Sequence, residues 1–347
     1  MKYKELTDML PKLVAKLAKM QSNDDEKMQY LFSVITSLSA MMPRVHVFSR
    51  HTGDSVNLSY INLEDQIEDE SIYDIKYLLK EVNEEITKRA KKDNHDELKE
   101  NVPYEFIFNN GCDSLYLLES LKYFENYGNL LITNMPQDYL ALLTPNRRTY
   151  RYYMMRLLMD NEEVCLSKDM YHDEIIQLPR ISMILSGITS QILSLAKEKD
   201  QVNLSRFLFT RTNHTHFNFM LGDPDFERLH KLSEKNAHSL KKLFVKLQEK
   251  DYEVTFTKEQ RTELDQYFIS IVTKCPERQK GKCLAILEEY LHNLIKLGSV
   301  LTVIRAYEEK RLEESLIATD NDFHAAFELI KMSLHICLNL YSIQFTY

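Results

Sequence analysis

The chain has 347 residues, of which 44% are hydrophobic and 28% charged, so it has room for two domains and a sizeable core. Its net charge of −8 argues against non-specific electrostatic binding of nucleic acid over the whole surface, because neutralising phosphates requires an excess of lysine and arginine. No segment approaches the roughly 18 to 20 apolar residues of a membrane span, and the charged N-terminal stretch does not resemble a secretory signal. Five cysteines without a CxxC pair favour a reducing cytoplasm.

Two helices are predicted in the first of three parts, residues 1–43. In "LPKLVAKLAKM" the apolar residues recur at helical spacing. "NDDEKMQYLFSVITSLSAMM" opens with the capping pattern Asn23 and Glu26 and ends before Pro43. Helix should dominate the whole chain, because seven glycines and eight prolines leave few long loops.

The second part, residues 44–221, alternates strands with helices. "VHVFSRHTGDSVNLSYINL" predicts two strands around residues 51–54, and a helix from about 72 to 92 follows the acidic loop "EDQIEDE". Further strands are predicted at 104–110, 128–134, 180–188 and 206–211. This alternation predicts an α/β fold with a mostly parallel sheet that helices cover on both faces.

The third part, residues 222–347, lacks a strand signal and predicts a bundle of about four helices. One helix should begin with the capping box Thr257 and Gln260. The next helix is broadly apolar around residues 291–304, so we expect it at the centre of the bundle. The last helix should be capped at Thr319 or Asp320.

Several phrases resemble one family, the P-loop, RecA-like proteins of Bacteroides-type mobile elements, which has no assigned function. "PRISMILSGITSQILSL" and "NLSRFLFTR" are similar to the family's Pro-[Arg/Lys]-Leu-Ser…Leu-Ser-Gly-Thr…Gln stretch and its Ser-Arg-Phe stretch. "HNLIKLGSVLTVIRAYEE" and "TDNDFHAAFELIKMSLHI" resemble its closing helices. The resemblance spans about residues 10–343, is specific in the last half and is weak between 55 and 150. It implies a P-loop NTPase-like core and a setting beside primases or in mobilizable transposons.

The phosphate site of such a core is not recognisable. A P-loop needs glycines that let backbone N–H groups wrap phosphate, a lysine for the β/γ-phosphates and Ser/Thr for Mg²⁺. No glycine lies between Gly53 and Gly111, and no Gly-Lys-Ser/Thr occurs. The positions where phosphates would dock carry the carboxylates of Glu64, Asp65, Glu68, Asp69 and Glu70. Carboxylates there would repel a triphosphate.

The acidic residue that would hold magnesium is also missing. After "GNLLITN" come Asn134, Met135, Pro136 and Gln137, and the nearest carboxylate is Asp138. We therefore expect a degenerate nucleotide site without cofactor. Arg206 is the one recognisable residue of such a site that the sequence still contains. Two interpretations are open: a former arginine finger that acts on the nucleotide of a neighbouring subunit, or part of an internal salt bridge. We favour the salt bridge, because ion-paired arginines are common near strand ends.

One segment is a candidate for DNA binding. "NRRTYRYYMMR" interleaves basic and aromatic residues, which are Arg147, Arg148, Tyr150, Arg151, Tyr152, Tyr153 and Arg156. Bases stack on tyrosine while arginine contacts phosphate. The alternative is an amphipathic helix with a solvated basic face, and the acidity of the whole chain favours it.

Other patterns carry weaker signals. His214 and His216 have the spacing of some metal pairs but no obvious third ligand, so no metal is expected. "YHDE" at 171–174 has no placed nucleophile, and Cys275 and Cys283 have no zinc-finger register. "KCPERQKGKC" and "KRAKK" are basic stretches of the kind usually found on solvated surface.

Together these observations predict a non-catalytic accessory protein of a mobile genetic element. It would support DNA replication, excision or mobilisation by binding a primase, a recombinase or an active ATPase relative, with DNA as a further candidate partner. Two alternatives remain open. One is an ATPase or helicase-like subunit that a partner chain completes, with Arg206 acting in trans, and the other is a pure protein-interaction module.

Overall fold

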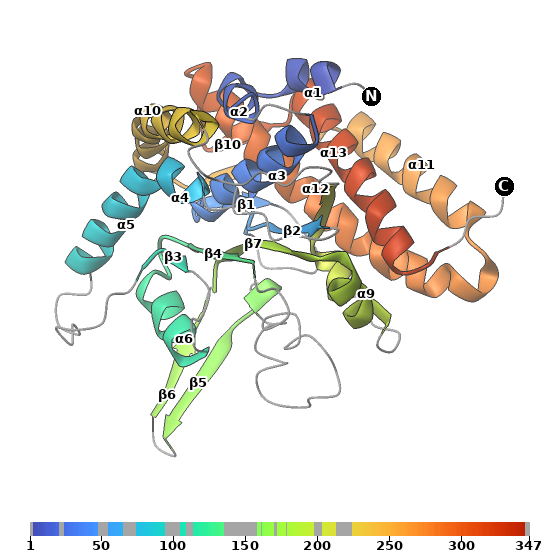
Figure 1. Cartoon of the computed structure of the whole chain (residues 1–347), viewed down its shortest axis with the longest axis horizontal. Helices are drawn as coiled ribbons and strands as arrows, with labels where there is room; N and C mark the ends of the chain where they lie inside the picture. Colours follow the sequence, from blue (N-terminus) through green and yellow to red (C-terminus); the bar gives the residue numbers. More distant parts are fainter. Residues whose placement is uncertain are drawn as a thin grey trace.

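The computed structural model describes residues 3–20, 24–47, 55–64, 74–93, 105–108, 114–134, 158–160, 162–169, 172–177, 179–197, 203–212 and 224–343. These residues form an α/β architecture in which parallel sheets are surrounded by helices (Figure 1). The predicted α/β class with a mostly parallel sheet is therefore confirmed.

A five-stranded parallel sheet lies at the centre of the predicted second part. Its strands, in spatial order, are β3 (Ile107–Phe108), β4 (Asn129–Thr133), β7 (Ile181–Ile188), β2 (Ser59–Glu64) and β8 (Leu208–Thr212). β2 and β4 are buried at every position, as expected for strands that are covered on both faces. Of the strand predicted at 104–110, residues 105–108 are described, and β3 occupies Ile107–Phe108.

A second parallel sheet joins distant parts of the chain, with the order β1 (Val45–Val47), β9 (Tyr252–Thr255) and β10 (Ser315–Ile317). The two strands predicted around residues 51–54 both form, but β1 and β2 belong to different sheets. The prediction of a purely helical third part was wrong, because β9 and β10 lie within it. Strands of four and three residues are too short to show a clear alternation.

An antiparallel hairpin of β5 (Val164–Asp169) and β6 (His172–Ile176) was not predicted. Its sequence mixes charged and apolar residues, so it lacks the continuous apolar run that revealed the central strands.

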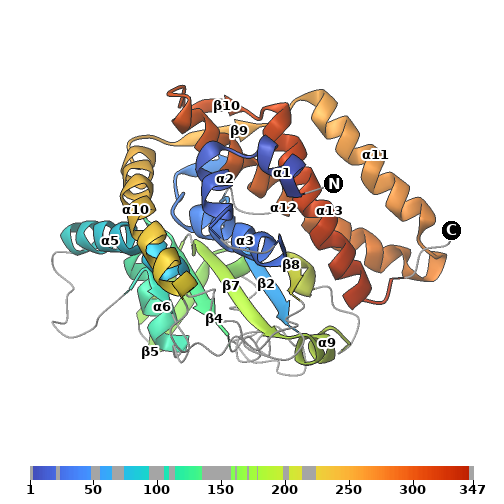
Figure 2. The same ribbon diagram turned by 45° about the horizontal axis from the view of Figure 1, so that its top comes forward.

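Three helices, not two, precede β1, namely α1 (Tyr3–Met9), α2 (Lys12–Ala18) and α3 (Asp24–Ala40). Pro11 separates the first two, since it stands at the N-cap of α2. α3 packs against β2, β4, β7 and β8. It covers the side of the sheet opposite α6 (Ser114–Tyr123) and α9 (Thr189–Lys197) (Figure 1; Figure 2).

The helix predicted from about residue 72 to 92 is divided into α4 (Asp74–Leu78) and α5 (Lys80–Asp93). Both pack against α10 (Pro224–Leu247), the first helix of the third part. A short 3-10 helix, η3 (Asn203–Arg206), leads into β8.

The four predicted C-terminal helices are confirmed as α10, α11 (Lys258–Lys274), α12 (Lys280–Glu308) and α13 (Asp320–Leu340). A 3-10 turn, η4 (Glu277–Gln279), separates α11 from α12. The capping box of Thr257 and Gln260 is present, and Thr319 caps α13 by accepting from the Asp322 N–H. α12 is central as predicted, because it contacts α2, α3, α11, α13 and all three strands of the second sheet.

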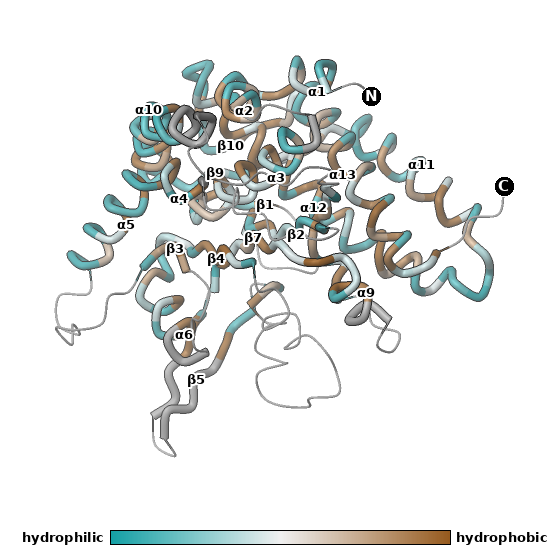
Figure 3. The backbone as a smooth tube through the Cα atoms, viewed as in Figure 1, coloured by the Kyte–Doolittle hydropathy of each residue, from teal (hydrophilic) through white to brown (hydrophobic). Residues whose placement is uncertain are grey.

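One hydrophobic core runs through all three predicted parts, from Leu6 to Ile343. Figure 3 shows apolar stretches along α12, α13 and the central strands, whereas α5 and α10 are largely hydrophilic. The boundaries predicted at 43 and 221 therefore separate stretches of sequence that share a core.

Candidate functional site

Open α/β sheets bind ligands beside the carboxyl ends of their strands. In the five-stranded sheet, this edge includes the ends of β2, β7 and β8, which run side by side. Tyr60, Asn62 and Glu64 of β2 share one face, because successive side chains of a strand alternate. That face turns towards α3, since the Phe32 ring of α3 is stacked on Tyr60 with the ring centroids 5.5 Å apart.

Glu64, the last residue of β2, is fully buried at this edge. Its carboxylate accepts hydrogen bonds from the Ser186 hydroxyl on β7 and from Asn62 Nδ2, the latter at 3.3 Å. Thr189 Oγ1, at the start of α9, donates to the Glu64 carbonyl at 2.9 Å. A buried carboxylate requires hydrogen-bonding partners, and here the protein supplies them itself.

The same network continues across β8. Asn62 Oδ1 accepts from Thr210 Oγ1 at 2.8 Å and from Thr212 Oγ1 at 2.9 Å. Thr212 Oγ1 also lies 3.2 Å from Gln29 Oε1 on α3. All four side chains are buried. The end of the central strands is thus occupied by side chains that hydrogen-bond to one another.

This geometry bears on the predicted phosphate position. Of the five carboxylates expected there, the structure describes Glu64, and Asp65, Glu68, Asp69 and Glu70 lie outside the described residues. Asn134 is described just after β4, and residues 135–138 are not. Glu64 alone is unfavourable for phosphate, because two anionic groups at close range repel strongly where water is excluded.

We expect Glu64→Ala to lower the free energy of unfolding by about 2 kcal/mol, because Ser186 and Asn62 would lose their buried acceptor. Urea denaturation followed by circular dichroism measures the change. The matched control is Glu313→Ala, an exposed carboxylate between α12 and β10, which should alter stability by less than about 0.5 kcal/mol. Equal stabilities of the two variants would contradict a structural role for the Glu64 network.

Arg206 lies at the opposite edge of the sheet, because it ends η3 just before the amino end of β8. Its Nε and Nη2 donate to the two carboxylate oxygens of Asp160 at 2.8 and 3.0 Å, and Nη2 lies 3.4 Å from Glu289 Oε1. The arginine side chain is 15% exposed. Arg206 therefore closes an internal salt bridge, the second of the two interpretations offered from the sequence.

Lys296 of α12 completes this charge cluster. Burial is the main cause that lowers the pKa of Lys296, although Glu289 and Asp160 act to raise it. Burial is likewise the main cause that raises the pKa of Glu289, although Arg206 acts to lower it. The cavity beside these groups measures about 20 Å³, enough for one water molecule but not for a nucleotide. We therefore interpret the cluster as a structural network of two cations and two carboxylates.

The candidate DNA-binding segment lies outside the described residues, with all of Arg147, Arg148, Tyr150, Arg151, Tyr152, Tyr153 and Arg156. His214 and His216 lie outside them as well. Cys275 and Cys283 are buried. Within the described part of the chain, no group of three or more His, Cys, Asp or Glu side chains could hold a metal ion.

Two basic stretches singled out in the sequence are described in part. In the first, Lys280 pairs with Glu277 at 2.5 Å, and Lys282 lies over the Tyr341 ring at 4.8 Å from its centroid. In the second, Arg89 pairs with Glu85 at 2.8 Å. These contacts fit the expected role of both stretches as ordinary surface.

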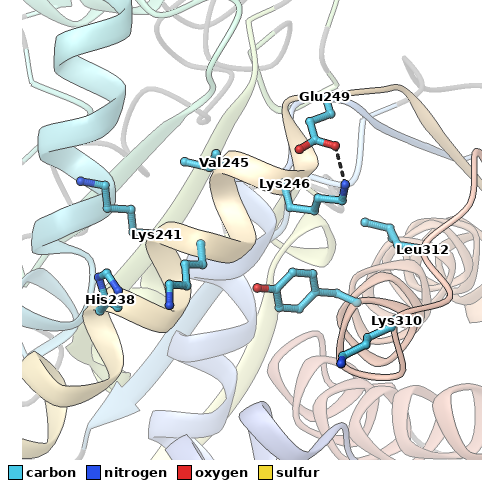
Figure 4. A pocket seen from close by; sticks show the side chains of 9 residues that line it. His238, Lys241, Val245, Lys246, Glu249, Lys310 and Leu312 are labelled. Atoms are coloured by element: carbon cyan, nitrogen blue, oxygen red, sulfur yellow. Dashed lines mark hydrogen bonds and ion pairs between the residues drawn. The ribbon is translucent and has the colours of Figure 1, made fainter.

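A groove that was not predicted lies between α10 and the end of α12 (Figure 4). Its volume is about 580 Å³. Five of its lining residues carry basic side chains, namely His238, Lys241, Lys242, Lys246 and Lys310, and Glu249 is its one lining carboxylate. The available sequence signal was the spacing of basic residues along α10 at intervals of three and four, from Lys231 to Lys246. The opposite side of the groove, with Tyr307, Lys310 and Leu312, has no regular spacing in the sequence, because these residues face α10 only where α12 ends beside it.

Within the described residues, no helix combines the length and apolar character needed to cross a membrane. No protein-family model matches the chain, and no curated protein matches it.

Proposed function

We propose that the chain is a non-catalytic accessory protein of a mobile genetic element, which supports DNA replication, excision or mobilisation by binding a protein partner and DNA. Its scaffold would be a RecA-like P-loop core in which the protein's own side chains replace the nucleotide. The mobile-element setting rests on the sequence resemblance, and the loss of catalysis rests on geometry.

Strand order supports the RecA-like scaffold. Numbered in chain order within the five-stranded sheet, β2, β3, β4, β7 and β8 are strands 1 to 5, and their spatial order is 2-3-4-1-5. RecA-like P-loop cores have this order. The first strand then stands between the fourth and the fifth, and the phosphate loop of an active core follows that first strand. β2 holds the corresponding place here.

The observation that carries the loss of nucleotide binding is the buried carboxylate of Glu64. In an active site of this class, backbone N–H groups and a lysine would face the phosphates after the first strand. Here the strand ends in a carboxylate that Ser186 and Asn62 hold by hydrogen bonds. An accessory role without hydrolysis is consistent with a RecA-like strand order that lacks a phosphate-binding site.

The internal pairing of Arg206 disfavours the ATPase alternative. An arginine that acts in trans must reach a neighbour's phosphate, whereas Arg206 is bidentate to Asp160 and lies at the amino edge of the sheet. Releasing it would break this bidentate contact and leave two buried carboxylates with Lys296 as the remaining cation of the cluster, at considerable cost. The interaction-module alternative differs from the proposal only in lacking a DNA contact.

The test is a calorimetric titration with ATP and Mg²⁺, supported by thermal unfolding in excess nucleotide. We expect no heat of binding and no shift of the unfolding midpoint. A ligand present at 100 times its Kd would add about 2.7 kcal/mol of stability, so a working site could not escape detection. Micromolar binding, or turnover that Asp138→Ala abolishes, would refute the proposal.

A further inference from the structure

We propose that the groove between α10 and the end of α12 binds single-stranded nucleic acid. Basic side chains of α10 and Lys310 would contact phosphates, and Tyr307 would contact a base. This assignment adds a binding site to the proposed function and does not depend on the loss of nucleotide hydrolysis.

A row of exposed basic side chains runs along α10 and ends in one wall of the groove. The row consists of Lys231, Lys235, His238, Lys242 and Lys246, of which the last three line the groove. With 3.6 residues per turn, these positions share one helix face, and the row extends about 22 Å along the helix. Successive members are about 4.5 to 6 Å apart along the axis. A row of this length can follow several consecutive phosphates of an extended strand.

Most carboxylates around the groove are already engaged. Glu249 pairs with Lys246, Glu81 with His238 at 3.1 Å, and Glu85 with Lys241 at 3.6 Å. The carboxylate of Glu308, beyond the groove, accepts from the backbone N–H groups of Lys12 and Leu13.

By contrast, Lys242 and Lys310 form no ion pair with any described residue, although both line the groove. Within the described part of the chain, therefore, no carboxylate is paired with either of these charges.

Lys310 occupies a backbone position that would suit glycine. It has φ 57° and follows the C-cap of α12. The Lys310 N–H donates to the Tyr307 carbonyl at 3.1 Å, and the Arg311 N–H donates to the Ala306 carbonyl at 2.9 Å. This pattern is a Schellman motif, whose left-handed residue is usually glycine. The chain thus keeps a lysine side chain beside the groove at a position where glycine would fit with less strain.

The opposite wall also supplies an aromatic ring and apolar surface. Tyr307 and Leu312 line the groove together with Val245 of α10. Figure 4 shows Lys246 and Lys310 on opposite sides of this space. Aromatic rings beside a basic track are characteristic of single-strand binding, because each unpaired base can stack on a ring while phosphates contact lysine. A duplex hides its base faces, and an acidic peptide would gain nothing specific from the ring.

Fluorescence anisotropy with labelled oligothymidylate tests the proposal. We expect Lys242→Glu/Lys310→Glu to weaken binding about tenfold or more and to reduce the salt slope by about 0.7 for each phosphate that is no longer neutralised. Tyr307→Ala should weaken binding of the single strand about fivefold or more and leave duplex binding unchanged. The control Lys91→Glu/Lys92→Glu reverses the same charge at exposed positions of α5 and should bind as the unaltered chain does.

Lys310→Gly separates binding from folding. It relieves the left-handed conformation, so we expect an unchanged or higher urea midpoint together with weaker binding. Three results would overturn the proposal. These are loss of binding only in Arg147→Glu/Arg148→Glu/Arg151→Glu, tighter binding of polyglutamate than of oligothymidylate, and no binding of the oligonucleotide at all. None of them would alter the outcome of the ATP titration.

Discussion

Gly128→Ala is expected to lower the free energy of unfolding by about 3 to 4 kcal/mol, because two costs add. Gly128 has φ +80°, a conformation that side chains rarely adopt, at the turn between α6 and β4. A Cβ at this position would lie 2.3 Å from the Ala40 carbonyl oxygen at the end of α3. That atom belongs to backbone, so the end of α3 or the start of β4 must shift.

Gly281→Ala is the matched control. Gly281 lies in the first turn of α12, and nothing lies within 4 Å of an added Cβ. Alanine is a better helix former than glycine, so this variant should be unchanged or more stable by up to about 1 kcal/mol. Urea denaturation of both variants gives the comparison. A Gly128→Ala variant as stable as the unaltered chain would contradict the tight approach of α3 to the sheet.

Arg206→Gln is expected to destabilise the fold by about 3 kcal/mol at neutral pH, because Asp160 and Glu289 would keep their burial and lose one of the two cations of the cluster, the one that is hydrogen-bonded to Asp160. The side chains of Asp160 and Glu289 are 11% and 22% exposed, so water screens them only in part. Arg261→Gln, an exposed position on α11, serves as the control and should change stability by less than about 0.5 kcal/mol. Equal stability of the two variants would contradict a structural salt bridge and would favour the interpretation in which Arg206 acts on a neighbouring subunit.

The effect of Arg206→Gln should also depend on pH. Arg206 lowers the pKa of Glu289 against the larger raising effect of burial, so its removal moves the folded-state pKa of Glu289 further above the unfolded value. The folded variant then retains a proton that the unfolded chain releases, and its stability falls as pH rises through that window. The difference from the unaltered chain should therefore be larger near about pH 8 than near about pH 5. A difference independent of pH would contradict this explanation.

The central strands could be predicted from the sequence because each is a local signal. β4 and β7 are apolar runs bounded by polar or turn residues, and burial on both faces requires such runs. In the second sheet β1 was predicted but β9 and β10 were not, and the pairing of all three strands joins segments that lie far apart in the chain. His46 of β1 lies opposite Glu253 of β9, and no local pattern announces this.

Part of the candidate site could be predicted from the local sequence and part could not. The absence of the glycines and the lysine of a phosphate loop can be read from the sequence, and the buried carboxylate of Glu64 is consistent with it. The partners of Arg206 are not local, because Asp160 and Glu289 come from segments on either side of it in the chain. The groove required the fold as well, since Lys310 approaches α10 only when α12 ends beside it.

The three-stranded sheet has a consequence for synthesis of the protein. β9 stands between β1 and β10, so the middle strand is translated long after its first neighbour and well before its second. A nascent chain carrying α1 to β1 has no edge for that strand to join until residue 255 has emerged, and the sheet is complete only after residue 317 has left the ribosome. Pairing at such sequence distance is slow, so β1 must wait for its partner through most of translation, whereas α3 can already pack on the five-stranded sheet.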